Sequence, residues 1–212
     1  MSKKKLEGAG LRGQVAGKTS LSTVGKAGKG LTYRGYPIEV LSEKAKFEEV
    51  AYLLMYGSLP NKDEYENYSS KLISMRSLPN PILEVLERIP ASAHPMDVMR
   101  TGCSMLGNIE PEGEFSNQQE SADRILATMA SIIVYWYKYS HEGKKVNTSS
   151  DYETIGGHFL SLLHGDEPSE DHIRCLDTSL ILYAEHGFNA STFTARTCAS
   201  TLSDIHSCIT GA

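Results

Sequence analysis

The spacing of apolar residues predicts helices along most of the chain after residue 37. Phe47–Tyr56 carries apolar residues at helical spacing, and Gly57 is a typical helix end. Asn61 is a strong N-cap residue for a second helix that runs to about Met75. The same spacing predicts further helices over Ile82–Arg88, His94–Gly107, Asp123–Ser140 and Ile155–His164, from Pro168–Asp171 to Tyr183, and from Asn189 toward Ile209.

Two polar stretches, Asn108–Ser121 and His141–Asp151, are predicted to be exposed loops between these helices. The helix before them, His94–Gly107, has apolar residues on most faces, so it is expected to be largely buried. Gly102 lies in its interior, where glycine costs about 1 kcal/mol relative to alanine. Its presence there indicates close packing against a neighbouring helix.

The first 36 residues follow a pattern that is typical of a β-hairpin. Thr19–Val24 alternates polar and apolar positions, Gly25–Gly30 can turn the chain, and Leu31–Tyr36 can return as the second strand. The sequence therefore predicts a mainly α fold, with a β-hairpin segment over residues 1–36 and a multi-helical domain over residues 37–212. Gly13–Thr19 resembles a phosphate-binding loop, but it has one residue too few between its glycines, so we reject that interpretation.

Composition narrows the function classes. With 212 residues, 40% hydrophobic residues and a formal net charge of -5, the chain resembles soluble globular proteins rather than basic nucleic-acid-binding proteins. The longest apolar stretch, Ile125–Tyr137, is shorter than the roughly 20 residues that span a bilayer. Lys3–Lys5 is not followed by the apolar segment of a signal peptide. We therefore expect a cytoplasmic protein with neither a membrane nor a nucleic-acid partner.

Cysteine and histidine spacing gives no sign of a disulfide framework or a metal centre. The cysteines lie in predicted helices without paired spacing, and we expect them to be reduced and packed: Cys103, Cys175, Cys198 and Cys208. None of the seven histidines falls in an HxxxH pair, and there is no CxxC motif. We therefore expect no metal site.

The stretch Tyr183–Arg196 contains the clearest candidate chemistry. An apolar run leads into Glu185 and His186, Gly187 breaks the helix, and Asn189 can cap the next one. A histidine between two helices can line a pocket. The spacing alone favours a simpler role, in which His186 only satisfies a carbonyl group at the helix end.

Three motifs together resemble the citrate synthase family. Leu31–Ile38, His94–Arg100 and Tyr183–Phe193 occur in the order and at about the distances of that family, and the resemblance covers nearly the whole chain. Ala93–Gly102 and Tyr135–His141 are most similar to the bacterial branch that forms 2-methylcitrate. The resemblance implies a multi-helical large domain and a homodimer, because members of the family dimerise through helices of that domain.

The resemblance also implies a carbon–carbon condensation, catalysed by an acyltransferase that converts the acyl group to an alkyl group on transfer. Propionyl-CoA by preference, or acetyl-CoA, loses a proton next to its thioester, and the enol attacks the ketone of oxaloacetate. Water then cleaves the thioester, which gives 2-methylcitrate or citrate and CoA. The CoA thioester is a substrate, so no cofactor is implied. The family uses an aspartate and two histidines, because a thioester enolate needs a positioned donor at its oxygen.

Residue by residue, the resemblance assigns His186 to contact oxaloacetate, a role that now outweighs the simpler one. Lys71 lies at a helix position associated with substrate in some members, although a solvated surface lysine is the favoured interpretation. Arg34 is expected to anchor the hairpin. Three further histidines are expected to be structural, with His94 capping its helix and His158 and His164 at helix-packing surfaces.

The sequence departs from the family pattern at Ile209–Ala212, where it stops. Family members continue into a Gly-Pro-X-His-Gly-Gly motif that carries the first catalytic histidine. We therefore expect residues 1–212 to hold none of the catalytic residues and to be inactive on their own. Two alternatives are an ordinary citrate synthase, acting in the tricarboxylic acid cycle rather than in propionate catabolism, and a non-catalytic helical module that dimerises.

Overall fold

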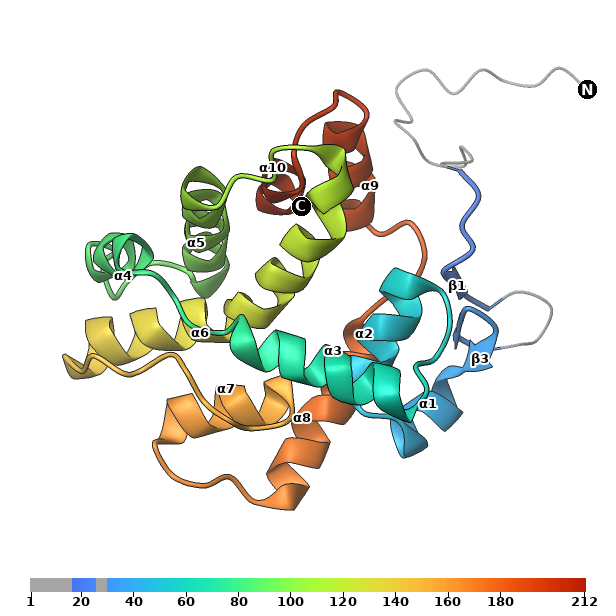
Figure 1. Cartoon of the computed structure of the whole chain (residues 1–212), viewed down its shortest axis with the longest axis horizontal. Helices are drawn as coiled ribbons and strands as arrows, with labels where there is room; N and C mark the ends of the chain where they lie inside the picture. Colours follow the sequence, from blue (N-terminus) through green and yellow to red (C-terminus); the bar gives the residue numbers. More distant parts are fainter. Residues whose placement is uncertain (1–16, 26–29) are drawn as a thin grey trace, which may run out of the picture.

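Helix α6, Gln118–Glu142, runs through the middle of the molecule, and α3, α4, α5, α7 and α10 pack against it (Figure 1). The computed structural model describes residues 17–25 and 30–212. The other elements are β1 Ser22–Thr23, β2 Thr32–Tyr33, β3 Tyr36–Pro37, α1 Ile38–Lys44, α2 Phe47–Tyr56, α3 Lys62–Ser74, α4 Asn80–Glu87, α5 Pro95–Ile109, η2 Phe115–Asn117, α7 Ile155–His164, α8 Glu170–Tyr183, α9 Ala190–Ala199 and α10 Ile205–Gly211. The predicted mainly α fold is confirmed. Within the two described ranges, no helix is both long and apolar enough to cross a membrane.

The N-terminal strands form a small antiparallel sheet in the order β1-β2-β3. The predicted pairing of the two stretches is confirmed, with Ser22 opposite Tyr33, but Tyr33 also pairs with Tyr36, so the expected return strand is itself folded back. The chain reverses at Arg34 and Gly35, whose φ angles are 46° and 93°. Arg34 anchors the sheet as expected, because its guanidinium donates a 3.0 Å hydrogen bond to the carbonyl of Leu54 in α2.

Several early predictions lie outside the described residues. These are the basic tip Lys3–Lys5, most of the phosphate-loop-like Gly13–Thr19, and the interior of the turn Gly25–Gly30.

The caps that the sequence predicted for α2 and α3 are confirmed. Gly57 ends α2 in the left-handed region with φ 104°. Asn61 caps α3: its Oδ1 accepts from the backbone N–H of Glu64 at 3.0 Å. Glu64 returns a contact, since its Oε2 accepts from the backbone N–H of Asn61 at 2.7 Å. Local residues therefore fix the end of α2 and the start of α3.

Helices α4, α5 and α6 enclose the largest apolar core. His94 caps α5, as expected, by accepting a 3.2 Å hydrogen bond from the backbone N–H of Met96 at Nδ1. The predicted close packing at Gly102 is confirmed, because this glycine lies against Ile132 of α6. The buried members of this core are Leu78, Ile82, Leu86, Val98, Cys103, Leu106, Ile125, Ile132, Tyr135 and Trp136.

Two helix boundaries differ from the sequence prediction. The polar stretch Asn108–Ser121 is not one exposed loop, because α6 already begins at Gln118 and Glu112 is buried. The predicted final helix is two helices, α9 and α10, separated by a turn in which Leu202 has a φ angle of 62°. Asp204 then caps α10 by accepting from the backbone N–H of Ser207.

The side-chain environments of some predicted residues also differ. His158 is fully buried, as expected for a packing position, whereas His164 is exposed at the end of α7. Cys103 and Cys208 are buried, but Cys175 is exposed, so not every cysteine is packed. These differences arise because helical spacing shows where a face lies but not which neighbour covers it.

A second core joins the N-terminal sheet to α8. Tyr33, Leu41, Val50 and Leu53 bury against Ile181 near the end of that helix. This contact places the sheet beside the chain segment that follows α8 (Figure 1).

Candidate functional site

The segment between α8 and α9 carries the candidate site. Helix α8 ends at Tyr183, Gly187 adopts a φ angle of 91°, and α9 starts at Ala190. Asn189 caps α9, since its Oδ1 accepts from the backbone N–H of Thr192 at 2.7 Å. The break at Gly187 and the cap at Asn189 are therefore where the sequence predicted them.

The N-terminal sheet holds this segment through Tyr33 and Ser22. The buried hydroxyl of Tyr33 donates to the carbonyl of Ile181 at 2.9 Å and accepts from the backbone N–H of Glu185 at 3.2 Å. The Glu185 carboxylate accepts from the backbone N–H of Gly187 and, at 3.4 Å, from the hydroxyl of Ser22. Polar contacts therefore fix the backbone on both sides of His186.

His186 itself is exposed on this ordered backbone. The carbonyls of Ile181 and Leu182, near the end of α8, accept from the Tyr33 hydroxyl. These helix-end groups are thus satisfied by the sheet, and the imidazole remains accessible to a ligand.

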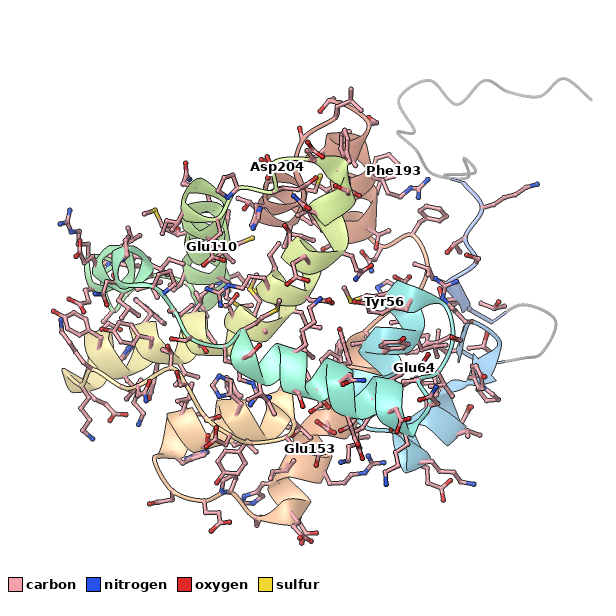
Figure 2. The ribbon with its side chains drawn as sticks, in the orientation of Figure 1. Tyr56, Glu64, Glu110, Glu153, Phe193 and Asp204 are labelled. Carbon is pink, nitrogen blue, oxygen red and sulfur yellow. The ribbon has the colours of Figure 1, made fainter. Side chains whose placement is uncertain are left out.

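A cationic and aromatic surface follows on α9. The guanidinium of Arg196 lies 5.1 Å from the centre of the Phe188 ring, a cation–π distance. Arg196 also lines a cavity of about 480 Å³ together with Phe193, Thr197, Ala199 and Ser200. Phe193 projects from α9 near the top of the molecule (Figure 2). An imidazole and a guanidinium on neighbouring segments are suited to binding carboxylates.

Lys71 is placed elsewhere, between α3 and α6. Its ammonium lies 2.7 Å from Oδ2 of the fully buried Asp123 and 2.5 Å from Oε2 of Glu120. The interpretation as a solvated surface lysine is therefore wrong, because two carboxylates hold the charge. The hydroxyls of Tyr56, labelled in Figure 2, and Tyr68 also donate hydrogen bonds to Asp123. Lys71 is therefore part of a polar cluster that joins α2, α3 and α6.

A buried polar network, which sequence analysis missed, joins α2, α7 and α8. Glu48 accepts from the backbone N–H of Ile155 at 2.6 Å, and burial, with the nearby charge of Asp177, raises its pKa to about 7. His158 contacts the hydroxyls of Ser131 and Ser150. Burial, together with the nearby positive charge of Arg76, lowers the pKa of His158 to about 3. Glu48 follows Phe47 on a pattern that suits an exposed helix start, so the sequence carried no signal of its burial.

The chain is similar to known proteins along nearly its whole length. The model of the family described as citrate synthase, C-terminal domain, matches residues 10–212. A 2-methylcitrate synthase of Shewanella oneidensis is 65% identical over 99% of this chain and 56% of its own length. Citrate synthase 2 of Bacillus subtilis is 38% identical over 96% of this chain and 55% of its own.

A solved structure gives the same result for the fold. The crystal structure of citrate synthase from Thermotoga maritima aligns with a TM-score of 0.82 at 34% identity, covering 96% of this chain and 53% of that one. The chain thus spans about half the length of the relatives that it matches. On the match over residues 10–212 and the identity to these relatives, the chain belongs to the citrate synthase family.

Proposed function

We propose that residues 1–212 form part of an enzyme that condenses propionyl-CoA with oxaloacetate and water to 2-methylcitrate and CoA. The observation that carries this proposal is the 65% identity to the 2-methylcitrate synthase of Shewanella oneidensis over 99% of the chain. Acetyl-CoA and citrate are the alternative pair, which the 38% identity to citrate synthase 2 of Bacillus subtilis supports less strongly. In either case the expected location is the cytoplasm.

Within this reaction, His186 is proposed to bind a carboxylate of oxaloacetate. Its ring is exposed on a backbone that Tyr33 and Glu185 hold in place, so binding requires little further ordering of the chain. Lys71 is the weaker substrate-binding prediction, because its ammonium already contacts Asp123 and Glu120. Its proposed contribution is to position α3 and α6.

The bond-forming step is proposed to use residues outside positions 1–212. The Gly-Pro-X-His-Gly-Gly motif of the family does not occur within residues 1–212, and the aspartate base and the two histidines that act in enolisation and ketone polarisation are proposed to lie elsewhere in the enzyme. The 212-residue chain by itself is therefore expected to release no CoA from propionyl-CoA and oxaloacetate. Activity must be measured in a longer protein that contains these residues.

A chimera provides that protein. Residues 1–212 would replace the matching part of the Shewanella oneidensis 2-methylcitrate synthase, and thiol release would report turnover with propionyl-CoA and with acetyl-CoA. We expect turnover with both and a higher kcat/KM with propionyl-CoA. A folded chimera without turnover on either substrate would refute the enzymatic proposal, and a preference for acetyl-CoA would favour the citrate synthase alternative.

The role of His186 is tested in the same chimera. His186→Gln and His186→Ala remove the imidazole and are expected to raise the KM for oxaloacetate by about 10-fold or more, the loss of one hydrogen bond to a charged group. The control is His172→Gln, which changes an exposed histidine near the start of α8. Parent-level kinetics in both His186 variants would show that this residue does not contact oxaloacetate.

A homodimer is proposed as the assembled state. Large apolar side chains remain exposed on the described surface, among them Met96 of α5 at 63% and Leu202 between α9 and α10 at 76%. Exposed apolar groups of this kind favour burial against a second copy. Light scattering after gel filtration is expected to give twice the monomer mass, and a monomeric elution at all concentrations would contradict this proposal and the non-catalytic dimerisation alternative.

A further inference from the structure

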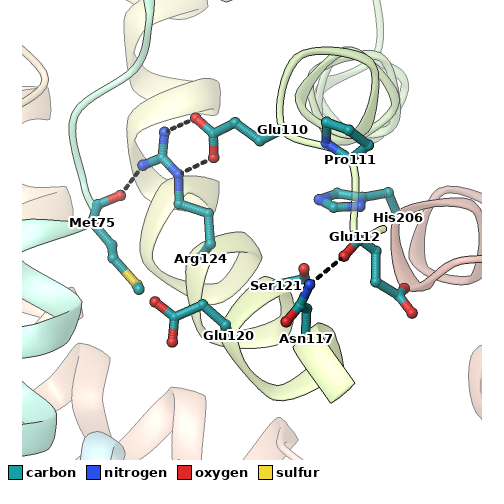
Figure 3. Close-up of a pocket in the computed structure, with 9 residues that line it drawn as sticks. All are labelled: Met75, Glu110, Pro111, Glu112, Asn117, Glu120, Ser121, Arg124 and His206. Carbon is teal, nitrogen blue, oxygen red and sulfur yellow. Dashed lines mark hydrogen bonds and ion pairs between the residues drawn. The ribbon is translucent and has the colours of Figure 1, made fainter. Parts of the chain in front are cut away.

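A cavity of about 300 Å³ lies where the α5–α6 connection meets the start of α10 (Figure 3). This volume is at the lower end of the range for small-molecule sites. Its lining is polar on several sides and consists of Met75, Glu110, Pro111, Glu112, Asn117, Glu120, Ser121, Arg124 and His206. It lies apart from His186, which belongs to the α8–α9 segment.

The buried imidazole of His206 is the main polar group that this cavity offers to a ligand. Its side chain is 4% exposed, yet neither Nδ1 nor Nε2 has a hydrogen-bond partner among residues 17–25 and 30–212. The carboxylate of Asp204 lies 3.7 Å from Nδ1, beyond hydrogen-bond distance. Burial lowers the pKa of His206, against the opposing charges of Asp204, Glu112 and Glu110. The neutral ring at pH 7 therefore offers one donor and one acceptor, and an unpaired buried polar group of this kind is costly.

The charged side chains of the lining indicate whether the cavity suits an anion or a cation. Arg124 is the only cation of the lining, and its guanidinium is already used: it donates to both carboxylate oxygens of Glu110 at 2.7 Å and to the carbonyls of Met75 and Ser77. It therefore has little capacity left for an anion.

Acceptors, by contrast, remain available around the cavity. Glu112 uses Oε2 to accept from the backbone N–H of Ile205, which leaves Oε1 without a protein donor among the described residues. Glu120 contributes a second carboxylate, one oxygen of which faces Lys71. Figure 3 shows the His206 ring between Pro111 and Glu112, on the side of the cavity opposite Arg124. The described residues contain no cluster of three or more His, Cys, Asp or Glu side chains that could hold a metal ion.

We propose that this cavity binds a small organic primary amine in its ammonium form, which donates hydrogen bonds to the His206 ring and to the Glu112 carboxylate. An ammonium has three N–H donors and a positive charge, which match an imidazole acceptor and a carboxylate. A ligand of only a few heavy atoms binds at best in about the millimolar range. This inference is independent of the proposed condensation reaction.

Ethylammonium is a suitable probe, with tetramethylammonium as its matched control because it carries the same charge without an N–H donor. Titration of the 212-residue chain, labelled at its histidines, would follow the ring resonances by NMR. The His206 signal is identified as the one that is missing in His206→Leu. Ethylammonium is expected to shift this signal with saturation, and tetramethylammonium is not.

Two variants test the contacts. Glu112→Gln keeps an oxygen for the Ile205 N–H but removes the charge, and it is expected to weaken ethylammonium binding by about 10-fold. His172→Gln on α8 should leave binding unchanged, and circular dichroism would verify that each variant is folded. The proposal is overturned if the His206 signal does not respond, if tetramethylammonium causes the same shift, or if folded Glu112→Gln binds as the parent does.

Discussion

Gly102 of α5 faces Ile132 of α6 so closely that a Cβ atom at position 102 would lie 2.5 Å from Cγ2 of the isoleucine. Real Cβ atoms do not approach another heavy atom to this distance, and Ile132 is itself fully buried. The glycine therefore sets the separation of the two helices that form the largest core. It is a structural requirement of the fold that sequence analysis anticipated.

Gly102→Ala is expected to lower the free energy of unfolding by about 1–2 kcal/mol. Overpacking of a filled core costs about 1–3 kcal/mol, and the better helix propensity of alanine recovers up to about 1 kcal/mol. Chemical denaturation would measure the change. A double-mutant cycle with Ile132→Ala provides the control, because that change removes the atoms that the new Cβ would meet. Strict additivity of the two changes would show that the contact is not the cause.

Lys71→Met is expected to destabilise the protein by about 1–3 kcal/mol, because the buried carboxylate of Asp123 loses its charged partner while it keeps the two tyrosine hydroxyls. Lys62→Met on the same helix is the matched control. Its ammonium lies 3.7 Å from Glu66 on an exposed surface, so its loss should cost less than about 0.5 kcal/mol. If Lys71→Met and Lys62→Met lowered the stability equally in thermal unfolding, the ion pair of Lys71 with Asp123 would contribute no more than an exposed surface pair.

Local signals explain which elements sequence analysis could predict. Gly57, Asn61 and His94 act on the backbone within a few residues of their own position, so their capping roles were visible in the sequence. The turn between α9 and α10 was not visible, because Leu202 supports it with a left-handed conformation that leucine rarely adopts. Neither a glycine nor a proline marks that break.

Long-range contacts explain what could not be predicted. The pocket residue His206 lies within the stretch from Asn189 toward Ile209 that was predicted to be helical, but its position over Gly107 and beside Glu112 depends on how α10 meets α5. The polar cluster around Lys71 and the burial of Glu48 likewise join residues more than 50 positions apart in the chain. His186 was identified as a candidate through the family resemblance, and its role in binding oxaloacetate remains a prediction.

Glu48→Gln is expected to remove a pH dependence of stability between about pH 4.5 and 7. In the folded chain the pKa of Glu48 is raised to about 7 from 4.5, so the folded state binds more protons than the unfolded state in this window. The contribution of the Glu48 carboxyl to the free energy of unfolding is therefore fully present below about pH 4.5. It decreases by a total of about 3 kcal/mol as the pH rises through about 7. The variant keeps an acceptor for the Ile155 N–H, so it should still fold.

The measurement is urea denaturation at a series of pH values, read as the difference between parent and variant. That difference is necessary because His158 contributes in the opposite direction. Its folded pKa is about 3 and its ordinary value 6.5, so its contribution is lost as the pH falls. Glu43→Gln, at an exposed position of α1, is the control. A Glu48→Gln profile parallel to that of the parent would refute the buried-carboxyl interpretation.

Tyr33→Phe tests how the N-terminal sheet supports the segment that carries His186. The change removes the hydroxyl that joins the Ile181 carbonyl to the Glu185 N–H. These two backbone groups, one buried and one partly buried, then lose their hydrogen bonds to Tyr33. The expected loss of stability is about 1–2 kcal/mol, whereas Tyr36→Phe at an exposed position of the same sheet should cost little. If His186 binds oxaloacetate, the chimera that carries Tyr33→Phe should also show a raised KM for oxaloacetate with kcat less affected, because the backbone around the imidazole is no longer fixed. A loss of stability with an unchanged KM would mean that the sheet stabilises α8 without positioning His186 for its ligand.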